Sequence, residues 1–257
     1  MRDLTITLVQ ADLAWQDPAA NRARLAALLD AAPALGELVI LPEMFATGFT
    51  MRAPAHAEGM DGPTVTWLRS EARTRGITLC GSLVIASGGR YYNRLVWAPP
   101  AGEPGWYDKR HLFRMAGEHR HYSAGAERRV FDLGGWRVCP LVCYDLRFPV
   151  WSRGANAFDL LLYVANWPVA RRPAWRALLP ARAVENQCYV AGVNRVGTDG
   201  HGVAYAGDSG AHHPLGHALL DLGDREGVGS VVLRGDELEA YRQQFPAWQD
   251  ADPFTLR

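Results

Sequence analysis

The chain has 257 residues, of which 48% are hydrophobic and 21% are charged, a composition typical of one globular unit with a large core. Its 27 basic side chains balance 27 acidic ones, so we expect neither nucleic acid nor an anionic membrane as a partner. Four scattered cysteines are too few for a disulfide scaffold at this length, and a cytoplasmic protein is expected.

Strand-like and helical segments alternate along the first half of the chain. Apolar and polar residues alternate from Leu4 to Val9, which is typical of a strand and not of a signal peptide. Asp17 before Pro18 indicates a helix start, with aspartate as the cap and proline at the first helical position. The further segments are a strand at 38–41, a helix at 63–75 that ends at Gly76, and two hairpin strands at 77–86 and 91–98.

The segment from Arg110 to Arg128 has no clean periodicity and is rich in charged residues and histidines. We interpret it as a long ordered loop, and such loops in compact domains are often functional. The longest apolar run, 160–166, is far shorter than the roughly twenty residues that a membrane span needs. The elements expected in this half are strands at 130–133, 137–142, 160–164, 189–196, 208–213 and 229–233 and helices at 149–154, 175–186 and 236–245.

The order of these elements predicts the architecture. Strands outnumber helices, yet helices recur in both halves, which favours stacked sheets faced by helices in an α/β fold. No linker, repeat or low-complexity stretch divides the chain. We therefore expect one domain over 1–257, with a short C-terminal helix and a tail from about residue 236.

Three reactive side chains stand where a buried-type strand stops. Glu43 follows the strand at 38–41, Lys109 follows Trp106-Tyr107-Asp108, and Cys143 follows the strand at 137–142. Strand ends at the rim of an α/β core are where open sheets collect their ligands. Together the three types suffice for acyl transfer: a thiol nucleophile, a carboxylate that takes its proton, and an ammonium that stabilises an oxyanion.

Three stretches around these residues give a specific resemblance: Leu-Pro-Glu-Met-Phe-Ala-Thr-Gly-Phe at 41–49, Tyr-Asp-Lys-Arg-His-Leu-Phe at 107–113 and Cys-Tyr-Asp-Leu-Arg-Phe-Pro at 143–149. They resemble, in order, the three signature segments of the nitrilase superfamily of carbon–nitrogen hydrolases. The likeness runs to about residue 235 and includes 165–168 and 181–187. Within the superfamily the chain is most similar to the ω-amidase branch, which deamidates small 2-oxo acid amides such as 2-oxoglutaramate and 2-oxosuccinamate.

The resemblance implies a fold, an assembly and a set of roles. It implies a four-layer α-β-β-α sandwich that pairs through helical faces into a homodimer or a larger even assembly. It implies no cofactor and a small amide as substrate. The roles implied are Cys143 as the nucleophile that forms a thioester, Glu43 as general base and acid, Lys109 and the backbone N–H of Tyr144 as oxyanion donors, and Glu118, upstream of Ser-Ala-Gly, as a residue that orients the substrate amide or Lys109.

Other candidates are weighed against plainer interpretations. Arg147 either binds a substrate carboxylate or holds the active-site turn in an ion pair, whereas Trp167, at a strand end, is expected to be a pocket wall. Arg171 and Arg172 either supply an anion site or are solvated residues at a helix start, and the second interpretation is favoured. No spacing of histidines supplies a convincing metal set, and the Gly-x-Ser-x-Gly elbow of serine hydrolases is absent from the sequence.

The resemblance does not decide which substrate the cysteine, glutamate and lysine act on. A nitrilase, an acyltransferase or an N-carbamoyl amidohydrolase would use the same cysteine, glutamate and lysine on another substrate. A binding protein that kept the fold without activity is a fourth alternative, against which the intact set of Glu43, Lys109 and Cys143 argues.

Overall fold

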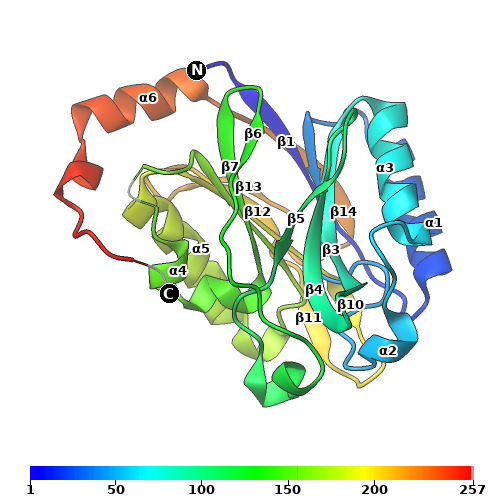
Figure 1. Cartoon of the computed structure of the whole chain (residues 1–257). Coiled ribbons are helices and arrows are strands. Elements are labelled where there is room, and N and C mark those ends of the chain that lie inside the picture. Colours follow the sequence, from blue (N-terminus) through cyan, green and yellow to red (C-terminus); the bar gives the residue numbers. More distant parts are fainter. Residues whose placement is uncertain (155, 256–257) are drawn as a thin grey trace.

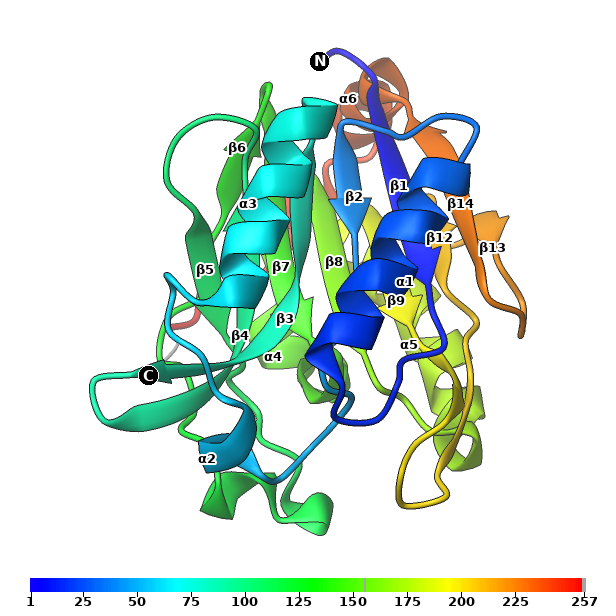
Figure 2. The ribbon, with the colours of Figure 1, turned by 90° about the vertical axis from the view of Figure 1, so that its right-hand side faces the viewer.

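The computed structural model describes residues 1–154 and 156–255. Two six-stranded sheets pack face to face, and helices cover the outer face of each (Figure 1). The view turned by 90° shows helices α1 and α3 side by side across the outside of the first sheet (Figure 2). The layers therefore run helix, sheet, sheet, helix, which confirms the four-layer sandwich expected from the sequence.

The first sheet has the strand order β14-β1-β2-β3-β4-β5. Strands β1, β2 and β3 are parallel, whereas β14, β4 and β5 are joined to their neighbours by antiparallel pairing. Strands β2 and β5 therefore run in the same direction and end at the same edge. The bounds are β1 Leu4–Gln10, β2 Leu38–Ile40, β3 Thr78–Ser87, β4 Arg90–Ala98, β5 Gly105–Asp108 and β14 Gly227–Leu233.

The second sheet has the order β13-β12-β9-β8-β7-β6, and its centre, β7, β8 and β9, is parallel. A separate two-stranded ribbon joins β10 to β11 beside the sandwich. The bounds are β6 Phe131–Leu133, β7 Trp136–Val142, β8 Leu160–Ala165, β9 Tyr189–Asn194, β10 Val196–Thr198, β11 Ala204–Ala206, β12 Gly210–His212 and β13 Ala218–Asp221.

The helix ends carry the signals that the sequence predicted. The Asp17 side chain accepts from the backbone N–H of Ala20 at 3.0 Å and so caps α1. Gly76 adopts the left-handed conformation that ends α3, at a φ of 66°. The α-helices are α1 Pro18–Ala31, α2 Ala53–His56, α3 Pro63–Arg75, α4 Pro149–Ser152, α5 Arg172–Asn186 and α6 Gly235–Gln244.

The main core lies between the two sheets and under α5. Both sheets contribute fully buried side chains to it, including Leu8 and Tyr107 from the first and Trp136 and Tyr163 from the second. A second apolar cluster fills the space between the first sheet and α1 with α3, through residues such as Leu25. In the part of the chain that the structure describes, no helix has both the length and the apolar character to cross a bilayer.

Most expected elements are present, and one strand is placed differently. The apolar run at 189–196 does not continue as one strand: β9 ends at Asn194, and Val196 begins β10 in the separate ribbon. The break occurs at Arg195, whose fully buried guanidinium turns to Asp12 and to the carbonyl of Leu13. Sequence patterns did not predict α2, β11 and β13, which are short.

Candidate active site

Cys143 is the first residue after β7 and begins a 3-10 turn, η3, over Cys143–Arg147. Its φ is 46°, in the left-handed region that residues with a side chain rarely adopt. Such a backbone persists only when its surroundings hold it. The buried Asp145 does so, since its carboxylate accepts from the Val142 N–H at 3.1 Å and from the Tyr107 hydroxyl at 2.7 Å.

Glu43 follows the end of β2, at the edge of the first sheet where β5 also ends, and is completely buried. Its Oε1 accepts from Lys109 Nζ at 2.9 Å and from Asn93 Nδ2 at 2.7 Å. Its Oε2 accepts from the backbone N–H of Asn166, at the end of β8, at 2.8 Å. Donors from both sheets therefore fix this carboxylate in one orientation.

Lys109 follows β5 and is also buried, between two carboxylates. Its Nζ donates to Glu43 at 2.9 Å and to both oxygens of Glu118 at 3.1 and 3.0 Å. Burial opposes its charge, but Glu118 and Glu43 outweigh burial and raise the pKa of Lys109. Burial, assisted by Glu43, raises the pKa of Glu118 against the opposing effect of Lys109. Lys109 is therefore a fixed ammonium.

The Cys143 thiol shares this site. Burial raises its pKa well above the ordinary value, the carboxylates of Glu43 and Glu118 add to the rise, and Lys109 opposes it. Glu43 therefore lies close enough to the thiol to influence its pKa. At neutral pH the cysteine is therefore a neutral thiol with a carboxylate beside it that can remove its proton.

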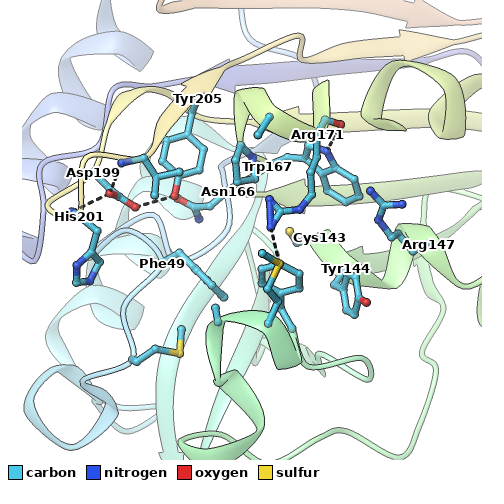
Figure 3. A pocket seen from close by; sticks show the side chains of 17 residues that line it. Phe49, Cys143, Tyr144, Arg147, Asn166, Trp167, Arg171, Asp199, His201 and Tyr205 are labelled. Carbon is cyan, nitrogen blue, oxygen red and sulfur yellow. Dashed lines mark hydrogen bonds between the residues drawn. The ribbon is translucent and has the colours of Figure 1, made fainter. Parts of the chain in front are cut away.

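A cavity of about 450 Å³ opens onto Cys143 (Figure 3). Its walls are mostly apolar and aromatic, and they include Phe49 and Tyr205. Two cationic side chains also line it, Arg147 from η3 and Arg171 from the segment before α5. A small molecule with an apolar body and a negative end fits these walls.

The model of the carbon–nitrogen hydrolase family matches residues 5–243. The chain belongs to this family. It is similar to a curated omega-amidase, YafV of Escherichia coli strain K12, at 46% identity over the full length of both chains. A 2-oxoglutaramate amidase of Bacillus subtilis is 32% identical over 96% of each chain. The structure of XC1258 from Xanthomonas campestris, a CN-hydrolase superfamily protein with an arsenic adduct in its active site, has 47% identity and a TM-score of 0.97 over both full chains.

The structure of this carbon–nitrogen hydrolase brings together the residues singled out in its sequence. Glu43, Lys109 and Glu118 form one buried cluster with the half-buried Cys143 beside it, although the four come from both sheets and from the long loop at 110–128. The residues that line the cavity beside this cluster include the three expected at the substrate, namely Tyr144, Arg147 and Trp167.

Other residues of the site were not assigned from the sequence. Asn166 directly follows the buried strand β8, so the same strand-end signal that singled out Cys143 also marks it. Asn93 lies inside β4, where sequence gives no such signal, yet it donates to both Glu43 and Glu118. Arg171, interpreted as a solvated residue at a helix start, does precede α5, but it is half-buried and also lines the cavity.

Proposed function

We propose that this chain is an ω-amidase that hydrolyses the terminal amide of a small 2-oxo acid amide, such as 2-oxoglutaramate or 2-oxosuccinamate, and releases ammonia. The observation that carries the proposal is a thiol beside a fixed carboxylate and ammonium, in an apolar cavity lined by two arginines. The names of the relatives from Escherichia coli and Bacillus subtilis support the same substrate class.

In the first half-reaction, Cys143 Sγ attacks the amide carbon while Glu43 removes the thiol proton. The amide oxygen becomes an oxyanion, which the Lys109 ammonium and the backbone N–H of Tyr144 stabilise. Glu43 then donates its proton to the amide nitrogen, the carbon–nitrogen bond breaks, and ammonia leaves. The acyl group remains as a thioester on Cys143.

In the second half-reaction, Glu43 removes a proton from a water molecule that attacks the thioester carbon. The same two donors hold the second oxyanion. The carbon–sulfur bond breaks, the proton on Glu43 returns to the sulfur, and the carboxylic acid product leaves. Glu118 acts on Lys109: its two hydrogen bonds hold the ammonium where the oxyanion forms.

Arg147 is proposed to bind the substrate carboxylate. Its guanidinium lies 5.2 Å from the ring centre of Trp167. Within residues 1–154 and 156–255 its guanidinium contacts this ring and is paired with no carboxylate, so the structure gives no support to the alternative of a structural ion pair. The planar guanidinium of such an arginine can bind a carboxylate through two parallel hydrogen bonds.

The direct test is ammonia release from the purified protein on a panel of 2-oxoglutaramate, 2-oxosuccinamate, glutamine, asparagine, an aliphatic nitrile and an N-carbamoyl amino acid. We expect the two oxo-acid amides to be the best substrates by kcat/KM. Turnover of the nitrile or of the carbamoyl compound alone would retain the thiol chemistry and reject the substrate class. Cys143→Ala is the control for contaminating activity.

A homodimer, or a larger even assembly built from such pairs, is proposed. The outward helices of the second sheet carry exposed apolar side chains, Val150 on α4 at 60% exposure and Val184 on α5 at 50%. Burying both across a two-fold axis would remove them from water. Light scattering after size exclusion should give twice the mass of one chain, or a larger even multiple, for the native protein. Val184→Asp should lower this mass, and a native monomer would reject the proposal.

The cytoplasm is proposed as the compartment. All four cysteines are free, and the proposed reaction needs Cys143 as a thiol. Such thiols persist where glutathione and thioredoxin keep them reduced. Cell fractionation followed by the amidase assay would place the activity.

A further inference from the structure

Arg171 lines the cavity, and its side chain contacts the long loop at 110–128. It ends the 3-10 turn η4, Val169–Arg171, directly before α5. Its guanidinium lies 5.0 Å from the ring centre of Phe113, and its Nη2 is 3.2 Å from Met115 Sδ (Figure 3, dashed line). Phe113 and Met115 belong to the loop that also carries Glu118, so Arg171 links the end of β8 to that loop.

The next residue, Arg172 at the start of α5, is an arginine that is paired with an acid. Arg172 grips Asp208 with two hydrogen bonds, Nε at 2.6 Å and Nη2 at 2.8 Å, and Arg176 adds a third at 2.6 Å. Arg171, by contrast, has no acidic partner among the described residues. Its contacts are a thioether, which is a weak acceptor, and an aromatic ring, although a guanidinium carries five donors.

The acidic side chain that lines the cavity does not serve as a partner for Arg171. Asp199 accepts from the backbone N–H groups of His201 at 2.9 Å and Val203 at 3.0 Å, and from the Tyr205 hydroxyl at 2.8 Å. Its carboxylate therefore holds the β10–β11 ribbon closed. Two arginines that line the cavity, Arg147 and Arg171, therefore have guanidinium N–H groups without an acidic partner among the described residues. An anionic ligand would accept hydrogen bonds from these groups.

One residue positions the two arginines. The ring of Trp167 lies under the Arg147 guanidinium at 5.2 Å, and its indole N–H donates to the Arg171 carbonyl at 2.8 Å. A 2-oxo acid offers three neighbouring acceptor oxygens, two on the carboxylate and one on the keto group. Three acceptors are enough for two guanidinium groups.

We propose that Arg171 is a specificity-determining residue, whose guanidinium leaves Met115 and binds the carboxylate end of the substrate together with Arg147. The inference rests on the proposed function, because it assigns the part of the site that selects an anionic amide. The loss of a thioether contact costs little compared with the charge-assisted hydrogen bonds gained.

The test compares an anionic with a neutral substrate. We would measure kcat/KM for 2-oxoglutaramate and for butyramide in the wild type, in Arg171→Met and in Arg172→Met. The ratio of the two values cancels the concentration of folded enzyme, so a loss of stability does not change it. Arg172→Met removes the same charge one residue away, from a side chain that already has its acid.

We expect the ratio to fall about 10- to 100-fold in Arg171→Met, the range for lost hydrogen bonds to a charged group. It should stay within about twofold of the wild type in Arg172→Met, because that side chain is bound to Asp208. An unchanged ratio in Arg171→Met overturns the inference. An equal fall in both variants also overturns it, because the effect would then come from net charge alone.

A second measurement needs no turnover. The product 2-oxoglutarate should protect Cys143 from iodoacetamide, and Arg171→Met should need about tenfold more of it than the wild type or Arg172→Met. Equal protection in all three overturns the role of Arg171. If the wild type hydrolyses neither amide, the proposed function fails, and the protection experiment still decides whether Arg171 binds the anion.

Discussion

In the proposed reaction, Cys143 and Glu43 exchange one proton in a site that disfavours the thiolate. Many cysteine hydrolases keep a thiolate beside a histidinium, which lowers the pKa of the thiol. Here burial and the carboxylates of Glu43 and Glu118 raise the pKa of Cys143, and Lys109 opposes them. In the proposed reaction the proton therefore leaves as the sulfur attacks, and Glu43 accepts it in that step.

This balance predicts two opposite effects of Glu43→Gln. Hydrolysis should fall about 10²- to 10⁴-fold, because the general base is lost. Alkylation of Cys143 by iodoacetamide at pH 8 should become faster, because removal of one negative neighbour lowers the pKa of the thiol and raises the thiolate fraction. Amidase rates and mass spectrometry of the adduct measure the two effects.

Cys143→Ala is the matched control, since it should show neither turnover nor an adduct. Cys80, Cys139 and Cys188 are buried, and burial raises the pKa of each, so the adduct should be single. Slower alkylation in Glu43→Gln would contradict the assigned charge balance.

The turn η3 depends on a carboxylate that reaches three other segments. Asp145 accepts from Val142 at the end of β7 and from the Tyr107 hydroxyl on β5. It also accepts from the backbone N–H of His111 at 2.9 Å and contacts the ring Nδ1 at 2.8 Å. This one side chain therefore sets the nucleophile turn relative to the strand that ends at Lys109.

Removing this carboxylate should affect stability and rate together. In Asp145→Ala several buried donors lose their acceptor, and each costs about 1–3 kcal/mol, so the free energy of unfolding should fall by several kcal/mol. The kcat of the folded fraction should fall as well, because Cys143 leaves its held backbone conformation. Urea titration and active-site titration measure the two effects.

Asp132→Ala is the control for that variant. Its carboxylate sits on the exposed β6–β7 hairpin and accepts a single long hydrogen bond from Gly135 at 3.5 Å. The unfolding free energy should change by less than about 0.5 kcal/mol there. Equal effects of the two substitutions would show that the four contacts of Asp145 do not hold the turn.

The sequence predicted the parts of the site that depend on local patterns. Glu43 and Cys143 stand out because a run of buried residues stops directly before each of them. Asn93 does not, because it lies inside β4, and its contact with Glu43 depends on how β4 and the end of β2 are placed in the folded sheet. Arg171 and Arg172 look alike in the sequence, and only the turn before α5 decides which one faces the cavity and which one meets Asp208.

The same limit applies to short elements. The order of the long strands and helices follows from hydrophobic periodicity, and caps such as Asp17 and Gly76 mark some of their ends. The three-residue strand β11 forms because it pairs with β10, and that pairing depends on the break at Arg195. A buried arginine inside an apolar run gives no periodic signal of a break.

The C-terminal helix is bound to the body of the molecule through polar contacts of its last turn. Arg242 donates to Asp159 at 2.6 Å and to the carbonyls of Phe158 at 2.7 Å and Gln187 at 2.8 Å. The Gln187 side chain in turn donates to the Phe245 carbonyl at 2.7 Å. Figure 1 shows α6 beside the N-terminus, and the N-terminal ammonium is 2.6 Å from Glu239 on this helix.

These contacts predict that the chain, α6 included, unfolds as one cooperative unit. Circular dichroism and amidase activity should be lost at the same temperature in the wild type, and Arg242→Ala should lower that temperature without splitting the transition. Two separate transitions would show that α6 is an independent unit and would reject a single domain over the whole chain.

The pH dependence of the change in Tm caused by Arg242→Ala tests whether the contact between Arg242 and Asp159 holds α6 in place. Although burial opposes it, hydrogen bonds from Arg137 and Arg242 hold the pKa of Asp159 below its ordinary value. A lowered folded-state pKa stabilises the protein above the unfolded-state pKa, about 3.9, and this contribution is lost as the pH falls through the folded-state value. The difference in Tm between wild type and Arg242→Ala should therefore be constant from about pH 8 to 5 and shrink below about pH 4. A difference that grows on acidification would mean that α6 is held by another group than Asp159.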